Sequence, residues 1–395
     1  MLGKDYVTRV LQAWSDMPAA PWNALLGAQG PESVGPFMRQ EYLAAMQSSG
    51  SATEQTGWGL RIVTVWQGDE LLAACPLYLK DHSYGEYVFD WAWANAYQQH
   101  GLSYYPKALV ASPFTPVPGP RLLAKNEVAR LALVQALLDW CREEQLSSLH
   151  LLFLSEPDLA ACTHAGLMLR QTVQFHWQNQ RPSDATRFAD FDDFLASLSQ
   201  DKRKKIRQER RKVAEAGVVF RWSRGKDIAQ ADWDFFYRCY ERTYLEHGNR
   251  PYLSRDFFAQ IADQIPEHWL LFMAEREGRA IGSSLIGLSQ DQSGSAAVAY
   301  GRYWGALERV DCLHFEACYY QPLAWCIEQG VGRFEGGAQG EHKMARALMP
   351  TPTHSAHWLA HPAFANAVER FLEREGEGVQ SYLEQLQNRT PFRQP

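Results

Sequence analysis

Residues 268–289, HWLLFMAEREGRAIGSSLIGLS, consist of two apolar runs separated by Glu277-Gly278. Apolar runs on both sides of a short turn that contains glycine are typical of a β-hairpin. Residues 60–80, LRIVTVWQGDELLAACPLYLK, have the same arrangement around Gly68-Asp69. The sequence therefore predicts one hairpin in each half of the chain.

The segments after each hairpin follow the same order of strand, helix and strand. In the second half these segments are 295–305, 312–330 and 331–337. In the first half they are 87–97, 126–145 and 147–154, followed by a further strand at 167–179. Pro322 is expected to kink or restart the helix in which it lies, and Gly330 to end it. The repeated order favours two copies of a small α/β (α+β) fold over one large sheet.

A helical connection is predicted between the two halves. Its helices span about 192–215 and 231–247, and Gly217 ends the first of them. We expect three parts: an N-terminal domain at 1–180, the connection at 181–250 and a C-terminal domain at 251–395. The likelier active site is expected in the last part.

Size and composition are those of a globular protein. A chain of 395 residues suits two domains, and 46% hydrophobic with 21% charged residues is ordinary. A net charge of −6 argues against a surface coated in basic residues for nucleic acid or anionic lipid. No segment has the apolar length of a signal peptide or a membrane span, so a cytoplasmic location is expected. The seven cysteines form no C-x-x-C pair; we expect reduced thiols and no metal site.

A basic run stands out against the negative total charge. Eight of the eleven residues 202–212 are Lys or Arg. On a helix they leave a thin packing stripe of Leu198, Ile206 and Val213. One interpretation is a contact with donor phosphates, RNA or anionic lipid, with Lys204, Lys205, Arg207 and Arg211 as its candidates. The other is a solvated helix paired with acidic neighbours.

The segment 334–350, FEGGAQGEHKMARALMP, has the strongest signature of a site. A strand is expected to end at Glu335, and the glycines after it allow close approach of the backbone to another group. The candidate catalytic residues are Glu335, Glu341, His342 and Lys343, and Gln339 and Arg346 are candidate substrate-binding residues. Acid, imidazole and ammonium groups there can orient a substrate and stabilise an oxyanion. The alternative is a turn with ordinary solvated polar residues.

Three more candidate substrate-binding residues lie on the strand 295–305. Alternation places Tyr300, Arg302 and Trp304 on one face. An Arg among aromatic rings holds a carboxylate or phosphate of a ligand, or pairs with a structural carboxylate. His314 and Glu316 are two residues apart, do not share a helix face, and are interpreted as structural.

Several classes of enzyme have no motif here. The sequence contains no G-x-S-x-G elbow, H-E-x-x-H pair, EF-hand loop, Walker loop or G-x-G-x-x-G pattern. A serine hydrolase, a zinc protease and a calcium sensor therefore have no support.

Three unusual stretches, YGRYWG (300–305), LHFEACYY (313–320) and FEGGAQGEHKMAR (334–346), resemble the bacterial Fem-like family of peptidoglycan biosynthesis and recognition proteins. The resemblance covers most of the chain and implies two tandem GNAT-like domains, the fold of acyl-CoA N-acyltransferases, each with a mixed, mostly antiparallel sheet flanked by helices. Fem enzymes transfer amino acids from aminoacyl-tRNA to a peptidoglycan precursor. Their catalytic region ends in an aromatic-Lys pair near the segment where His342-Lys343 lies here.

The resemblance and the residues together lead to one main hypothesis and two alternatives. The first is transfer of an acyl or aminoacyl group to a small or peptide-like amine, with Lys343 stabilising the oxyanion or positioning phosphate, and Glu341 or Glu335 orienting or deprotonating the amine. The donor would be acyl-CoA or aminoacyl-tRNA, and no cofactor is expected to bind tightly. The alternatives are a non-catalytic module that binds a cell-wall precursor or peptide, and acyl-CoA-dependent N-acetylation of a small amine.

Overall fold

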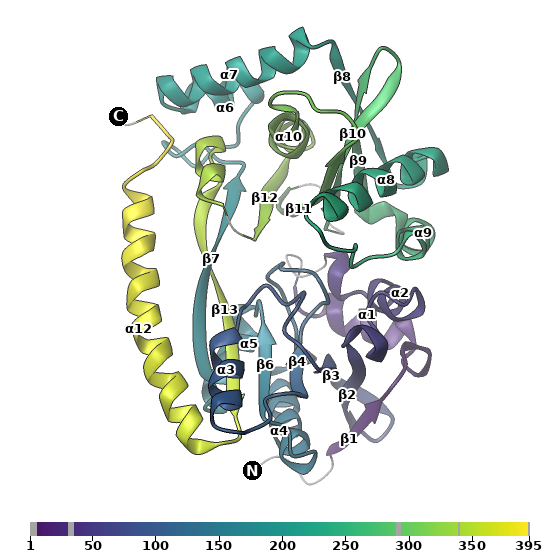
Figure 1. Cartoon of the computed structure of the whole chain (residues 1–395), viewed down its shortest axis with the longest axis vertical. Coiled ribbons are helices and arrows are strands. Elements are labelled where there is room, and N and C mark those ends of the chain that lie inside the picture. Colours follow the sequence, from purple (N-terminus) through teal and green to yellow (C-terminus); the bar gives the residue numbers. More distant parts are fainter. Residues whose placement is uncertain (1–5, 31–34, 290–293, 339, 394–395) are drawn as a thin grey trace. The chain divides into compact units, whose positions relative to one another are not determined.

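The computed structural model describes residues 6–30, 35–289, 294–338 and 340–393. The chain divides into two compact units (Figure 1). Unit 1 consists of 1–173 and 352–383, and unit 2 of 174–351 and 384–395. This division differs from the ranges 1–180, 181–250 and 251–395, because the chain returns to unit 1 after completing most of unit 2. The helical connection belongs to unit 2.

Unit 1 contains a mixed sheet in the order β1-β2-β3-β4-β6-β13. Its strands are β1 (Tyr6–Leu11), β2 (Gly59–Gln67), β3 (Glu70–Lys80), β4 (Lys107–Val110), β6 (Ser148–Leu152) and β13 (Met349–Leu359), and β5 (Leu123–Ala124) pairs with β3. Only β4 and β6 pair in parallel; the other pairs are antiparallel. The helices with residues in this unit are α1 (Ala19–Gly27), α2 (Gln40–Ser48), α3 (Trp91–Gln99), α4 (Glu127–Glu143), α5 (Glu156–His164) and α12 (Pro362–Gln387).

The two faces of this sheet differ in chemistry. Ala108, Leu149 and Ala356 face an apolar core that also contains residues of α4. Neighbouring positions on the same strands point the other way, because side chains alternate along a strand. This second face carries Lys107, His150 and His357, all buried.

The prediction of a strand at 87–97 is wrong, because α3 occupies most of this segment. Trp93 and Tyr97 are four residues apart, lie on one side of the helix, and pack against Val368 and Leu372 of α12. A short aromatic run fits both periodicities, and here the tertiary partner decides for the helix. The third strand of the first half is β4.

In unit 2 the strands follow the order β7-β12-β11-β10-β9-β8, and among the described residues they belong to the same 13-stranded sheet as the strands of unit 1. The strands of unit 2 are the second part of β7 (Met168–Gln178), β8 (Val218–Arg224), β9 (Trp269–Arg276), β10 (Arg279–Leu288), β11 (Gly294–Ala306) and β12 (Val331–Ala338). Its helices are α6 (Phe191–Ser197), α7 (Gln200–Glu215), α8 (Gln230–Glu246), α9 (Arg255–Gln264), α10 (Leu313–Phe315) and α11 (Gln321–Glu328). Among these described strands only β11 and β12 pair in parallel, so unit 2, like unit 1, combines one parallel pair with antiparallel pairs.

The predicted hairpins are present in both units as β2-β3 and β9-β10. At the second turn Glu277 and Gly278 have φ values of 52° and 71°, the left-handed backbone that a two-residue hairpin turn requires. The predicted order of hairpin, strand, helix and strand is confirmed in unit 2. In unit 1 the same order holds once β4 replaces the segment 87–97.

Two predicted helices are interrupted. The helix expected at 192–215 breaks between α6 and α7, where Leu198 is extended and forms a β-bridge with Phe392. The helix expected at 312–330 contains a π-helical turn at Glu316–Tyr320, which separates α10 from α11. Pro322 lies in the first turn of α11, directly after the π-helical turn, at the position where the sequence predicts that the helix kinks or restarts. Within the described part of the chain, no helix is long and apolar enough to cross a membrane.

Candidate active site

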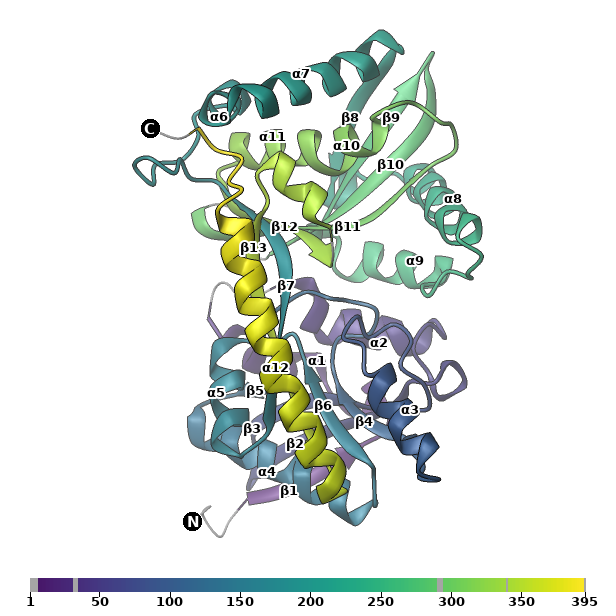
Figure 2. The same cartoon turned by 60° about the vertical axis from the view of Figure 1, so that its left-hand side comes forward.

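A cleft in unit 2 is lined by residues of β11 and β12 among others. Figure 2 shows these two strands in the sheet of this unit. The parallel pairing of these strands extends to Tyr300 opposite Glu335. Beyond this point β11 stays paired with β10 as far as Ala306, whereas β12 pairs with β7 and places Ala338 opposite Gln174. The separation leaves a pocket of about 120 Å³.

The cleft combines aromatic walls with a few polar groups. Among the residues that line it are Ser284, Trp304, His314, Cys318, Tyr319 and Gly336. Apolar walls with a few polar groups are typical of sites that bind small molecules. Sequence analysis missed Ser284 and Tyr319, and interpreted His314 and Cys318 as structural, because their approach depends on how the helical segment folds over the strands.

Gly336 has to be a glycine because its own chain packs against it. A Cβ atom there would lie 2.5 Å from Cδ2 of Leu348 and 3.3 Å from Cδ of Lys343. The close backbone approach expected at this glycine therefore accommodates the side chain of Lys343. The Lys343 stem thus passes directly over a residue that lines the cleft.

Lys343 is a buried ammonium group without a carboxylate partner. Its side chain is about 5% exposed, and its Nζ atom donates hydrogen bonds to the carbonyl oxygens of Gly337 (3.2 Å) and Ala338 (3.1 Å). An ammonium has three N–H donors, so one has no partner among the described residues and is available to a ligand. Burial lowers the pKa of Lys343 to about 8. At pH 7 the group is mostly protonated and electropositive.

His314 and Cys318 are uncharged at neutral pH. The ring of His314 lies 5.5 Å from that of Trp304 and 5.8 Å from that of Tyr319. Burial, together with the nearby His342, Arg346 and Lys343, lowers the pKa of His314 to about 4. Burial raises the pKa of the Cys318 thiol to about 12. Neither group therefore supplies charge to the cleft, which leaves Arg302 in its lining and Lys343 beside Gly336 as the nearby cations.

Tyr300, Arg302 and Trp304 do not share a face, contrary to the prediction. The register between β10 and β11 shifts at Arg302, which is the extra residue of a β-bulge. Trp304 therefore pairs with Ser284 and Tyr300 with Gly287, which point to opposite faces. Arg302 lines the cleft, and its guanidinium lies over the ring of Tyr303, 5.0 Å from the centroid.

Glu335 is buried on the face opposite to Gly336 and the cleft. It pairs in register with Tyr300 and with His176 of β7. One oxygen accepts a hydrogen bond from Nε of Arg333 (3.1 Å), and the other lies 4.0 Å from Nε2 of His176. The structure therefore does not bring Glu335 and Lys343 together on one face of the sheet. His176 was not foreseen, because its strand belongs to the other half of the sequence.

The remaining candidates of this segment have different surroundings. Glu341 is exposed and forms an ion pair with Arg389 (3.2 Å). His342 is also exposed, and its ring folds back over Gly340, where a Cβ atom would lie 2.6 Å from Cε1. Gln339 lies outside the described residues. The four proposed catalytic residues therefore do not form one constellation.

Arg346 is fully engaged by its own chain. Its Nη2 atom lies 2.9 and 2.8 Å from the two carboxylate oxygens of Glu209 on α7, and its Nε donates to the hydroxyl of Tyr320 (3.2 Å). The guanidinium also lies 3.7 Å from the ring centroid of Phe315. The predicted role in substrate binding is replaced by a structural one, which holds the segment 341–346 against α7.

The basic run forms the exposed side of α7. Ile206, Glu209 and Val213 face inward, whereas Lys204, Lys205, Arg207 and Arg211 are exposed. Arg207 and Arg211 form only long ion pairs, with Asp192 (3.8 Å) and Glu215 (3.6 Å), and such exposed pairs are weak. A groove of about 780 Å³ runs along this side and is lined by Arg203, Lys204, Arg207 and Arg211 among others.

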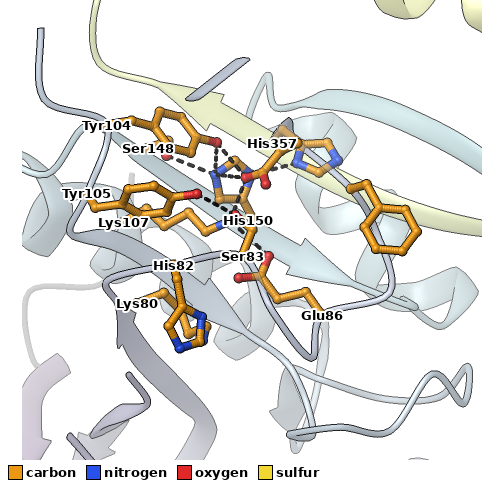
Figure 3. Close-up of polar contacts among 12 residues, drawn as sticks. Lys80, His82, Ser83, Glu86, Tyr104, Tyr105, Lys107, Ser148, His150 and His357 are labelled. Carbon is orange, nitrogen blue, oxygen red and sulfur yellow. Dashed lines mark hydrogen bonds and ion pairs between the residues drawn. The ribbon is translucent and has the colours of Figure 1, made fainter. Parts of the chain in front are cut away.

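A second polar cluster, which sequence analysis missed, lies on the polar face of the sheet in unit 1 (Figure 3). Nζ of Lys107 donates to Ser83 Oγ (2.8 Å), Glu86 Oε2 (2.8 Å) and Asp90 Oδ2 (2.5 Å). Burial alone would lower the pKa of Lys107, but the two carboxylates raise it above its ordinary value. The hydroxyl of Tyr104 donates to Asp90 Oδ2 (2.6 Å).

Two buried histidines continue this cluster across β6 and β13 (Figure 3). His150 and His357 face each other in register and share a hydrogen bond between their Nδ1 atoms (2.8 Å). Nε2 of His150 lies 2.8 Å from Ser148 Oγ and 3.1 Å from the hydroxyl of Tyr104. Burial lowers the pKa of His150 to about 3 and that of His357 well below its ordinary value. No sequence motif marks these residues, because they come from five separate segments.

Two units of mixed strand pairing, each with one parallel pair of strands, define a GNAT-like α/β protein. The family described as FemAB-like, peptidoglycan biosynthesis/recognition, matches residues 13–394. The chain therefore belongs to this Fem-like family, as the resemblance implied. No curated protein matches the chain.

Several solved structures are similar to the chain at low sequence identity. The structure of FemX is similar with a TM-score of 0.54 and 10% identity, and the match covers 91% of this chain and 100% of FemX. A structure of L-PGS from Bacillus licheniformis matches with a TM-score of 0.49 and 10% identity, over 86% of this chain and 98% of that one. A tandem GNAT protein from the clavulanic acid biosynthesis pathway matches with a TM-score of 0.48 and 14% identity, over 90% and 99%.

Proposed function

We propose that unit 2 transfers an acyl or aminoacyl group from an activated donor to an amine. The observation that carries this proposal is Lys343, a buried ammonium whose stem packs against Gly336 in the lining of the cleft. Its Nζ atom makes two hydrogen bonds among the described residues, which leaves one N–H without a partner there. Membership of the Fem-like family supports the same reaction class.

The reaction requires stabilisation of a developing negative charge. The amine nitrogen attacks the carbonyl carbon of a thioester or ester, and the carbonyl oxygen becomes an oxyanion. Lys343 donates its remaining N–H to this oxygen, and its charge is strong there because the group is shielded from water. The C–S or C–O bond then breaks, the amide forms, and the amine proton leaves with the sulfur or oxygen.

The donor is proposed to bear phosphates that contact α7. Lys204, Arg207 and Arg211 line one groove, and Lys205 is exposed on the same helix. The ion pairs of Arg207 and Arg211 with acidic residues are long and exposed. Both acyl-CoA and aminoacyl-tRNA have this chemistry. The family description favours a peptidoglycan precursor amine as the acceptor.

A screen of acyl-CoAs and charged tRNAs with amine acceptors tests this function. Lys343→Met removes the ammonium but keeps the length of the stem, and we expect transfer to fall about 100-fold or more, as when one oxyanion donor is lost. The exposed Lys226→Met is the matched control and should keep wild-type activity. Equal activity of the Lys343 variant would remove this residue from the mechanism.

A second function, binding of a precursor peptide without catalysis, is favoured by one observation. No carboxylate lines the cleft among the residues described for it, because Glu335 faces the other way. Binding of a peptide acceptor by the wild type, without transfer from any donor in the same screen, would establish this function instead.

A further inference from the structure

The connection between β3 and β4 covers the polar face of the sheet in unit 1, and its side chains bind Lys107 on that face. Residues 81–106 contain α3, and three of their side chains, Ser83, Glu86 and Asp90, bind the ammonium of Lys107. Glu86 and Asp90 are about 3% exposed, and Lys107 is fully buried. We call residues 81–106 the strap.

The residues next to these anchors point outward and are aromatic. Tyr84 follows Ser83 and is 60% exposed, and Trp91 follows Asp90 and is 37% exposed. Their rings contact each other, with centroids 5.1 Å apart and planes at 63°. His82 extends the group, because its ring centroid lies 5.4 Å from that of Tyr84. Two buried anchors therefore hold two exposed rings in fixed positions.

Helix α3 continues this surface with neutral hydrogen-bonding groups. Asn95 and Gln98 are exposed and lie four and seven residues after Trp91, on the same side of the helix. At 1.5 Å per residue, Trp91 to Gln98 spans about 10 Å. Trp93 and Tyr97 face the opposite way and are buried in the core. The outer side of α3 therefore presents a ring followed by two amides.

The exposed surface of the strap carries almost no charge. Residues 81–106 contain no Lys or Arg, and Asp81 is their one exposed acid, since Glu86 and Asp90 are buried. Arg170 donates to the backbone oxygen of Phe89 but is neutralised by Glu375 (2.7 Å). A surface without cations does not suit nucleic acid or anionic lipid, which require Lys and Arg.

Burying the charged groups that anchor the strap costs desolvation free energy, and a role of the exposed surface in binding accounts for that cost. Desolvation of an ammonium and two carboxylates offsets most of their mutual attraction, so such a cluster adds little stability compared with apolar packing. It does fix the strap in one conformation. A rigid surface binds a ligand without paying to order its side chains first.

From this arrangement we propose that Tyr84 and Trp91, with Asn95 and Gln98, form a binding surface for a neutral oligosaccharide. The apolar C–H face of a sugar ring packs on an aromatic ring, and its hydroxyl and acetamido groups pair with side-chain amides. A length of about 10 Å fits about two sugar units. This site is separate from the cleft of unit 2 and does not depend on acyl transfer.

Calorimetric titration of the full chain with N,N′,N″-triacetylchitotriose tests the proposal. We expect Trp91→Ala and Tyr84→Ala each to weaken binding by about tenfold, the ratio that the loss of one aromatic contact gives. Trp222→Ala removes another exposed tryptophan, 49% exposed on β8 of unit 2, and should leave the affinity unchanged. Unfolding midpoints of the variants should stay close to wild type, because both rings are exposed.

Three results would overturn the proposal. The first is absence of binding by the wild type at millimolar trisaccharide, and the second is unchanged affinity in both strap variants. The third comes from neutral phosphatidylcholine vesicles: if the chain sediments with them and both variants abolish this, the surface contacts lipid instead. A loss of acyl transfer in Lys343 variants has no bearing on these measurements, so the two proposals fail independently.

Discussion

At the scale of single residues, the two lysines Lys107 and Lys343 show how neighbours decide the role of a buried ammonium. Burial lowers the pKa of both, because water no longer solvates the charge. For Lys107 the carboxylates of Glu86 and Asp90 outweigh this effect and raise the pKa. For Lys343 the two backbone carbonyls do not outweigh the effect of burial, and the pKa of Lys343 falls to about 8. The first lysine is a structural ion, whereas the second can serve a reaction.

The buried histidines of unit 1 predict a dependence of stability on pH. The pKa of His150 is lowered to about 3, and that of His357 is also far below 6.5, so the unfolded chain binds more protons between pH 3 and 6.5. Stability should therefore fall as pH drops below 6.5, by up to about 1.4 kcal/mol per pH unit for each histidine. Glu86 opposes this, because burial raises its pKa to about 7 and its stabilising contribution decreases from pH 4.5 to 7.

Unfolding in urea between pH 4 and 7 measures this effect. His357→Gln keeps a polar group but cannot titrate, so the slope of stability against pH should become shallower by about one proton. His100→Gln, at an exposed position, is the matched control. An unchanged slope in the His357 variant would show that this histidine does not contribute to the acid sensitivity.

At the scale of elements, α7 combines two different surfaces in one helix. Glu209 points inward to Arg346, and the ion pair connects the helix to the segment after β12. Tyr320 adds its hydroxyl to the same carboxylate. One turn away, Arg211 and Glu215 form a pair in which each side chain is 69% exposed. Because it is buried, the Glu209–Arg346 pair is a structural contact. The Arg211–Glu215 pair is exposed to solvent and has no structural role.

These two pairs predict different costs of mutation. Glu209→Gln leaves the buried guanidinium of Arg346 without a counter-charge, and the free energy of unfolding should drop by about 3 kcal/mol. Arg211→Gln breaks the exposed pair and should change it by less than about 0.5 kcal/mol. Chemical denaturation of the full chain measures both. Equal effects of the two substitutions would contradict the structural role of Glu209.

At the scale of the whole molecule, charge is distributed unevenly. The chain carries a net charge of −6, yet α7 gathers exposed cations along one groove of unit 2, and the strap of unit 1 has none. Total charge therefore says little about what each unit binds. A polyanion should bind at α7 and be repelled by the remaining surface, which makes its affinity sensitive to salt.

Replacing four cationic residues of α7 tests whether this helix is the contact for a polyanion. Combined replacement of Lys204, Lys205, Arg207 and Arg211 by Gln should weaken binding of tRNA and reduce the slope of log affinity against log salt by about 3. Filter binding at several NaCl concentrations measures the slope. Arg279→Gln, on the β9-β10 turn and with a side chain 69% exposed, should leave it unchanged. An identical slope in the fourfold variant would exclude α7 as the phosphate contact.

Sequence patterns predicted helices and strands best where the periodicity of a segment agrees with the way it packs in the tertiary structure. The hairpins, α4 and β12 follow from turn residues and from the periodicity of apolar residues. The segment 87–97 was predicted as a strand, because its aromatic spacing fits both the helical and the strand period; most of it lies in α3, which packs against α12. The shift at Arg302 also escaped prediction, because a β-bulge depends on the neighbouring strand.

By itself the sequence determined the α/β class, the repeated order of elements and the family. It did so because periodicity, turns and unusual strings are properties of neighbouring residues. The tertiary structure alone decided which of the candidates meet. It placed Glu335 on the far face, engaged Arg346 with Glu209, brought His314 and Cys318 to the cleft, and joined Lys107 to the strap. These contacts join residues far apart in the chain, and only the pairing of strands and the packing of helices bring them together.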